Sequence, residues 1–132
     1  IDQLHTGTVV GKMEGTADEV LTINELLHED WHQFHKLRED WSGMKPTMPI
    51  ASGGMHPALL PQLVEILGSD LIANFGGGVH GHRDGSAAGA RGCRQAAEAI
   101  AEGIKLDKYA KNHEELAVAL SQWGGVQYKY KR

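Results

Sequence analysis

The sequence predicts an α/β fold, because three short apolar strands alternate with helices and each strand precedes a glycine-rich loop. The expected strands are residues 3–5, 48–51 and 71–75. The last is almost entirely apolar, which is typical of a parallel sheet covered on both faces. Three such units form either a small open sheet or part of a larger (β/α)8 barrel, since a closed barrel needs about 250 residues. Glycine-rich loops after all three strands favour the barrel, whose active sites occupy those loops.

The first helix is expected to begin at Thr16, which has capping-box spacing with Glu19. Apolar residues then recur with a period near 3.6, and this pattern extends the predicted helix as far as Phe34. The stripe consists of Val20, Ile23, Leu27, Trp31 and Phe34.

Three more helices follow from the same periodicity. Pro57 opens the next helix and Gly68 ends it, and Leu60, Leu63, Val64 and Leu67 line it. A long alanine-rich helix runs from about Ser86 to Gly103, with the predicted stripe Ala90, Cys93, Ala97, Ile100, Ala101 and Ile104. A closing helix presents Leu116, Ala119, Leu120 and Trp123. Residues 76–82 are expected to be a loop, and residues 125–132 a polar tail.

Composition excludes several classes of function. The net charge of −4 over 132 residues provides no basic field for nucleic acid or an anionic membrane. No apolar run approaches the roughly 18 residues that span a bilayer. The single cysteine, Cys93, allows no internal disulfide and predicts a reducing, cytoplasmic location. We interpret Cys93 as a small buried apolar residue rather than a nucleophile.

Two glycine clusters predict a phosphate site. Gly76, Gly77 and Gly78 follow one strand, and Gly53 and Gly54 follow the neighbouring one, beside the hydroxyl of Ser52. Glycines let the backbone approach an anion and direct its N–H groups toward it. Each cluster alone is typical of a turn, but two in successive strand–helix loops match the place where barrels bind phosphate.

Two other motifs have competing interpretations. Lys12 lies between Gly11 and Gly15, which suits a lid that carries a cation into a closed site, although an exposed surface lysine is the commoner case. His28-Glu29-Asp30-Trp31-His32 matches the zinc-protease pattern H-E-x-x-H. Its histidines fall on a flank of the predicted helix, away from the apolar stripe, so a histidine-rich outer face is the preferred interpretation.

Three motifs in order resemble the large subunit of ribulose-1,5-bisphosphate carboxylase/oxygenase (Rubisco). Residues 4–15 (LHTGTVVGKMEG) resemble its sixth barrel strand and loop, 49–56 (PIASGGMH) the seventh, and 74–82 (NFGGGVHGH) the eighth. The similarity extends from about residue 2 to residue 124. The helix after residue 15 and the ending 114–124 resemble archaeal members, of form III or II/III. The resemblance implies strand–helix units 6 to 8 of a (β/α)8 TIM barrel, followed by closing helices.

The resemblance also implies roles for particular residues. Lys12 matches the lysine of the closing loop, which orients CO2 and stabilises the carboxylated transition state, and Glu14 matches the glutamate that holds it. His5 matches a ligand of the phosphate on carbon 5. The expected substrate-binding residues are His5, Ser52, Gly53, Gly54, Asn74, Phe75, Gly76 and Gly77, the last two as backbone donors to the phosphate on carbon 1. Asn74 stands where the family more often has a glutamine.

The family's Mg2+ site has no counterpart in this sequence. Its carbamylated lysine, acidic ligands and enolising lysine match no residue here, so Mg2+ is expected to bind ligands elsewhere in the subunit and none in this chain. The expected partners are ribulose-1,5-bisphosphate, CO2, O2, the remainder of the large subunit, and further copies in a homodimer or an assembly of dimers. Neither nucleic acid nor a membrane is expected. The chain is interpreted as a segment of a longer subunit or one half of a split enzyme, inactive alone.

Three alternatives to the carboxylase remain. A Rubisco-like enolase or isomerase of sulfur salvage shares the fold and part of the phosphate site, but its relatives often lose residues around the sixth loop. Lys12, Glu14, His5 and Ser52 together favour the carboxylase. A non-catalytic assembly module would use the glycine loops only as turns. The zinc protease is the third alternative.

Overall fold

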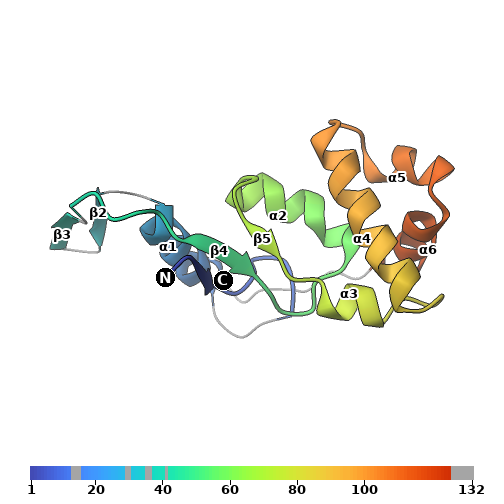
Figure 1. The fold of residues 1–132 in the computed structure, drawn as a ribbon, viewed down its shortest axis with the longest axis horizontal. Helices are drawn as coiled ribbons and strands as arrows, with labels where there is room; N and C mark the ends of the chain where they lie inside the picture. Colours follow the sequence, from blue (N-terminus) through green and yellow to red (C-terminus); the bar gives the residue numbers. More distant parts are fainter. Residues whose placement is uncertain (13–15, 29–30, 35–36, 41, 126–132) are drawn as a thin grey trace.

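Three parallel strands form the sheet of this computed structural model, which describes residues 1–12, 16–28, 31–34, 37–40 and 42–125. Strand β4 (Met48–Ala51) lies between β1 (Gln3–His5) and β5 (Ile72–Ala73) (Figure 1). The register sets His5 opposite Ile50 and Ala51 opposite Ala73. The predicted α/β class and parallel pairing are confirmed.

Two strands have their predicted bounds, but β5 is shorter than the predicted 71–75. Beyond its two residues, the Asn74 N–H still donates to the Ala51 carbonyl at 2.9 Å. The chain then turns into a short helix at Gly76. The apolar run that predicted this strand is therefore longer than the strand itself.

Helix α1 (Ala17–His28) begins at the predicted capping box. The Thr16 N–H donates to the Glu19 carboxylate at 3.0 Å, and the Glu19 N–H donates to the Thr16 hydroxyl at 3.3 Å. Both bonds satisfy amides that have no acceptor within the helix.

The predicted extension of this helix to Phe34 is wrong. The helix ends at His28, and β2 (Trp31–Phe34) pairs antiparallel with β3 (Leu37–Asp40). At the helix end, the Thr47 N–H donates to the Leu27 carbonyl at 2.9 Å, so a carbonyl of the last turn is satisfied from outside the helix. Tryptophan and phenylalanine are also common in strands, so their spacing did not distinguish the two structures.

The second helix forms where expected. A 3-10 turn (Pro57–Leu59) leads into α2 (Leu60–Leu67), and Gly68 ends it with a φ of +80°. Leu63 on its inner face is fully buried.

A short helix, α3 (Gly76–His80), replaces the predicted loop at 76–82. Glycine is a poor helix former, so local propensity does not predict it. A tertiary contact stabilises this helix, because the Gly78 N–H donates to the Met55 carbonyl at 2.9 Å. Within the turn, the Val79 N–H donates to the Phe75 carbonyl at 2.8 Å.

Helix α4 (Ser86–Ala101) has its predicted position but a different buried face. Ala90, Ala97 and Ala101 of the predicted stripe are exposed, whereas Cys93 is buried as expected. The buried residues are Ala88, Gly89, Gly92, Cys93, Ala96 and Ala99. Alanines lie on both faces of this helix, so hydrophobicity did not distinguish the buried face from the exposed one. Close packing marks the buried face, because a Cβ at Gly92 would be 3.2 Å from the Glu115 carbonyl of α6.

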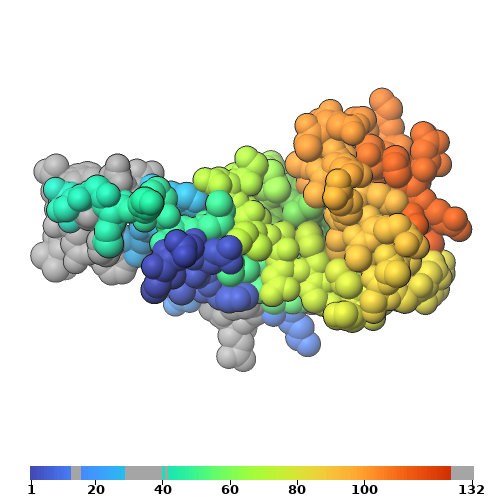
Figure 2. All heavy atoms as spheres, viewed as in Figure 1, coloured from blue at the N-terminus to red at the C-terminus, as the bar shows by residue number. Residues whose placement is uncertain are grey.

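The closing region contains α5 (Leu106–Tyr109), a 3-10 turn (Ala110–Asn112) and α6 (Glu114–Trp123). Leu116 and Ala119 of α6 are fully buried, as predicted. Figures 1 and 2 show the molecule as elongated, with α4, α5 and α6 gathered at one end and β2 and β3 at the other. The polar tail was predicted at 125–132, and all but its first residue lies outside the described residues.

A polar contact joins α4 to α6 through Glu115. Its carboxylate accepts from Arg91 Nε at 2.6 Å and from Gln95 Nε2 at 2.8 Å. Gln95 Oε1 in turn accepts from the Leu116 N–H at 2.9 Å. These hydrogen bonds, first from Gln95 and then from Arg91, lower the pKa of Glu115 from 4.5 to about 2.

The lowered pKa of Glu115 predicts an acid-dependent loss of stability. A carboxyl with a lower pKa in the folded state stabilises the fold fully above its unfolded pKa, and this contribution is lost as pH falls from about 4.5 toward 2. Glu115→Gln should therefore lower the free energy of unfolding at neutral pH, and its difference from wild type should shrink across that interval. Urea unfolding at each pH measures this. Glu114→Gln, at the exposed neighbour, is the control, and an equal, pH-independent loss in both variants would contradict the prediction.

Candidate functional site

The three loops with predicted site residues lie at one edge of the sheet. Because β1, β4 and β5 are parallel, their carboxyl ends meet there, and the segments 6–12, 52–56 and 74–80 follow them. Figure 1 shows α3 beyond the ends of β4 and β5. Residues far apart in the sequence are thereby brought together.

His5 and Ser52 are in direct contact. His5 Nδ1 lies 3.0 Å from the Ser52 hydroxyl. Backbone bonds fix the pair, since the Ser52 N–H donates to the Gly7 carbonyl at 3.3 Å and the Thr6 N–H donates to the Ile50 carbonyl at 3.1 Å. His5 is exposed and Ser52 half-buried, so both are open to a ligand.

Lys12 is held by its backbone to the loop after β4. Its N–H donates to the Gly53 carbonyl at 2.8 Å, while its side chain is exposed. Gly54 has a φ of +62°, and a Cβ there would lie 2.9 Å from the Lys12 Cβ. Glycine is therefore required at position 54 both by backbone conformation and by space. Glu14, the predicted partner of Lys12, lies outside the described residues.

The loop after β5 (74–80) packs against the loop after β4 (52–56). Asn74 Oδ1 accepts from the Gly76 N–H at 3.3 Å, so this side chain engages one of the two predicted phosphate donors. Phe75 is half-buried against the core, and Gly76 and Gly77 are exposed at the start of α3. The contact between Gly78 and Met55 joins this loop to the segment 52–56.

Two residues near the site, Thr8 and His56, were not singled out from the sequence. Thr8 is buried and its hydroxyl donates to Met55 Sδ at 3.2 Å. His56 is buried and stacks on Trp123 of α6, with ring centroids 5.5 Å apart, and burial lowers the pKa of its imidazole. The positions of Thr8 and His56 beside the glycine motifs were the available signal.

The described residues contain no group of three or more His, Cys, Asp or Glu side chains that could hold a metal ion. No helix in the same part is long and apolar enough to cross a membrane.

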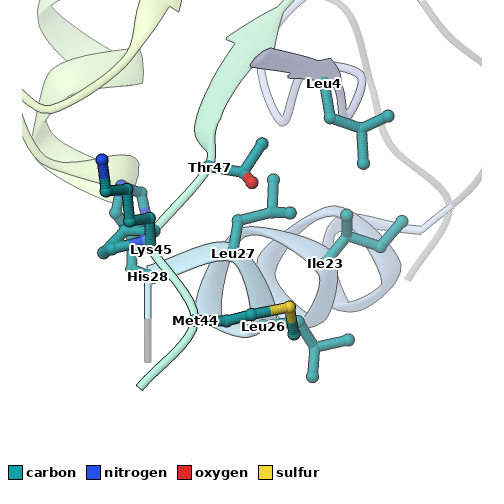
Figure 3. Close-up of a pocket in the computed structure, with 9 residues that line it drawn as sticks. Leu4, Ile23, Leu26, Leu27, His28, Met44, Lys45 and Thr47 are labelled. Atoms are coloured by element: carbon teal, nitrogen blue, oxygen red, sulfur yellow. The ribbon is translucent and has the colours of Figure 1, made fainter. Parts of the chain in front are cut away.

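One groove lies away from these loops. It is bounded by Leu4 of β1, by Ile23, Leu26, Leu27 and His28 of α1, and by residues 44–47 (Figure 3). Its lining is mostly apolar, and Leu4, Ile23 and Met44 remain exposed. None of the predicted site residues that the structure describes lines it, so it is not the candidate site.

Comparison with known families shows which family this chain belongs to. Residues 1–123 match the family model described as ribulose bisphosphate carboxylase large chain, catalytic domain. The chain belongs to the Rubisco large-subunit family. Among curated relatives, it is 52% identical over 128 residues to the ribulose bisphosphate carboxylase of Methanosarcina acetivorans and 50% identical over 127 residues to that of Methanocaldococcus jannaschii. Each alignment covers 93% of this chain and 30% of the relative, so the chain spans about a third of the relatives' length.

Solved Rubisco structures have the same arrangement. The dimeric archaeal Rubisco of Hyperthermus butylicus matches with a TM-score of 0.84 and 44% identity, over 96% of this chain and 30% of that one. The octameric Rubisco of Pyrococcus horikoshii matches with a TM-score of 0.80 and 44% identity, over 94% and 28%. The predicted archaeal type is thereby confirmed.

The zinc-protease alternative loses its structural basis. Its two histidines would have to share one helix, but His28 is the last residue of α1 and His32 belongs to β2. The predicted place of the motif on the flank of a continuous helix is therefore wrong.

Cys93 is buried, as the sequence predicted. It is 7% exposed, and burial raises the pKa of its thiol to about 11. Because the thiolate is the reactive form, we predict slow modification of the native chain by a thiol reagent at mildly alkaline pH, and complete modification of this single cysteine after unfolding in urea. A spectroscopic thiol titration measures both. Native reactivity equal to that of the unfolded chain would contradict the buried, protonated thiol.

Proposed function

We propose that this chain supplies the closing-loop lysine and the phosphate-binding loops of a ribulose-1,5-bisphosphate carboxylase/oxygenase. The observation that carries the proposal is the convergence of the segments that follow β1 and β5 on the segment that follows β4. Ser52 contacts His5, Gly53 binds the Lys12 backbone, and Met55 holds the start of α3 through Gly78. Family membership supports the same activity.

The sheet fits units 6 to 8 of a (β/α)8 barrel, with residues 1–124 as the barrel segment and 125–132 as a tail. All three residues of β1 are exposed, and the apolar groove beside it is only partly covered. In a barrel, the preceding strand would pair with β1 and a preceding helix would cover the groove. The remainder of the large subunit is thus the first partner, and homodimers or assemblies of dimers are the second. The dimeric and octameric archaeal enzymes support oligomers.

In this proposal Lys12 is catalytic and Glu14 orients it. Ribulose-1,5-bisphosphate is enolised, its enediolate attacks CO2, and the carboxylated product is hydrated and cleaved to two molecules of 3-phosphoglycerate. O2 competes for the same enediolate. A lysine ammonium near the new carboxylate stabilises charge that develops in the transition state, and a closed loop excludes water that would screen it.

The remaining predicted residues would bind the substrate. Imidazole and hydroxyl groups that already touch, as in His5 and Ser52, suit one phosphate and an adjacent sugar hydroxyl. Backbone amides at Gly76 and Gly77 suit the second phosphate, beside Asn74 and Phe75. The backbone of Gly53 and Gly54 would contact the substrate between its two phosphates. Mg2+ would supply electrophilic stabilisation of the enediolate from ligands elsewhere in the subunit.

The enolase or isomerase of sulfur salvage receives no support from the relatives, which carry the name of the carboxylase. A non-catalytic module would give no reason for exposed His5 and Lys12 to converge on one loop. Labelled CO2 fixation into 3-phosphoglycerate, measured with ribulose-1,5-bisphosphate, Mg2+ and the complete assembly, tests the proposal directly. Absence of fixation by a folded assembly would favour the enolase-like function, and turnover by the pure 132-residue chain alone would refute the predicted dependence on the rest of the subunit.

Replacing Lys12 distinguishes carboxylation from enolisation. In the complete assembly, Lys12→Ala should lower the carboxylation kcat by about 10²–10³-fold, the usual effect of losing a group that stabilises transition-state charge. Enolisation precedes that step, so exchange of the carbon-3 proton of the substrate with solvent should persist in part. Lys108→Ala, at an exposed lysine of α5, is the matched control and should leave both rates unchanged. Survival of carboxylation in Lys12→Ala would remove the assigned role.

A further inference from the structure

We propose that Thr8 is a positioning residue that sets the backbone of Lys12 against the loop after β4. The inference rests on the proposed role of Lys12 and adds to it the means by which that lysine is held. Thr8 lies three residues beyond the end of β1, at the base of the segment that leads to Lys12. Its side chain is only 1% exposed, which removes it from direct contact with a substrate.

The Thr8 hydroxyl organises the turn that follows it. Its Oγ1 accepts from the Val10 N–H and from the Gly11 N–H, each at 3.2 Å. The same hydroxyl donates to Met55 Sδ at 3.2 Å. One buried oxygen therefore shapes residues 8–11 and also joins them to the segment after β4. A threonine hydroxyl that bonds backbone amides two and three residues ahead is a recognised local turn.

The turn brings two backbones into close contact. At Gly11 a Cβ would overlap the Gly53 carbonyl oxygen, and the next residue, Lys12, donates its N–H to that same oxygen at 2.8 Å. Gly54 also lies against Lys12, since a Cβ there would be 2.9 Å from the Lys12 Cβ. The bond from Lys12 to Gly53 thus holds the chain at residues 11 and 12 against the loop after β4, and the Thr8 hydroxyl holds the turn that leads into this bond.

The hydroxyl, rather than the shape of the side chain, carries this role. Valine has nearly the same volume as threonine but offers no acceptor, so Thr8→Val removes the bonds to two buried amides and to Met55. Removing an acceptor from a buried N–H is costly, so the turn at residues 8–11 is expected to loosen. Serine keeps the hydroxyl and loses only the methyl group. The pair Thr8→Val and Thr8→Ser therefore separates positioning from packing.

The test uses both variants in the complete assembly. Thr8→Val should lower the carboxylation kcat by roughly ten- to a hundredfold, because displacement of a catalytic group by about 1 Å can cost on the order of 10²-fold. Exchange of the carbon-3 proton should fall far less, since enolisation precedes the step proposed for Lys12. Thr8→Ser should retain most of both rates. Equal losses of both rates in Thr8→Val, or the same loss of carboxylation in Thr8→Ser, would overturn the positioning role.

A second measurement is independent of catalysis. Amide hydrogen exchange at Val10, Gly11 and Lys12 should be faster in Thr8→Val than in wild type and close to wild type in Thr8→Ser. This result would support the positioning of the backbone even if the wild-type assembly fixed no CO2, so failure of the proposed function is distinguishable from failure of the inference. Unchanged exchange in Thr8→Val would overturn the inference, whatever the activity.

Discussion

The backbone from Ile50 to Met55 is the constraint on which the other loops depend. Its carbonyl groups accept hydrogen bonds from both neighbouring segments: Ile50 and Gly53 from Thr6 and Lys12 on one side, and Ala51 and Met55 from Asn74 and Gly78 on the other. A strand in the middle of a parallel sheet can bond to both neighbours, and here the loop beyond the strand continues to do so. The site is therefore organised around the segment after β4 rather than around any single side chain.

Much of this site could be predicted from the sequence because glycine motifs report backbone proximity directly. The clusters at 53–54 and 76–78 indicated where the backbone must approach another group, and strand order then brings them to one edge. The same reasoning did not identify Thr8, because threonine is common in turns and its burial against Met55, 47 residues away, is visible only in the structure. The roles of the site residues stay predictions, and Glu14 lies outside the described residues.

The fold shows where periodicity stops being informative. The capping box at Thr16 and the strand at Met48–Ala51 were predicted correctly because each follows from local chemistry. The end of α1, the short helix at Gly76–His80 and the buried face of α4 were not, because each is decided by a partner distant in sequence. A glycine pressed against α6 contributes to packing by its small size, which no scale of hydrophobicity records.

The buried state of Cys93 has a practical consequence for observing the lysine loop. The only thiol of this chain is buried and is expected to react slowly with thiol reagents. A cysteine introduced at an exposed position would therefore be the site that takes up a fluorophore or spin label. Two such probes, one on either side of the contact between Gly11 and Gly53, would report the separation of the loops in solution. Because the native cysteine is shielded, such distance measurements would not require its removal first.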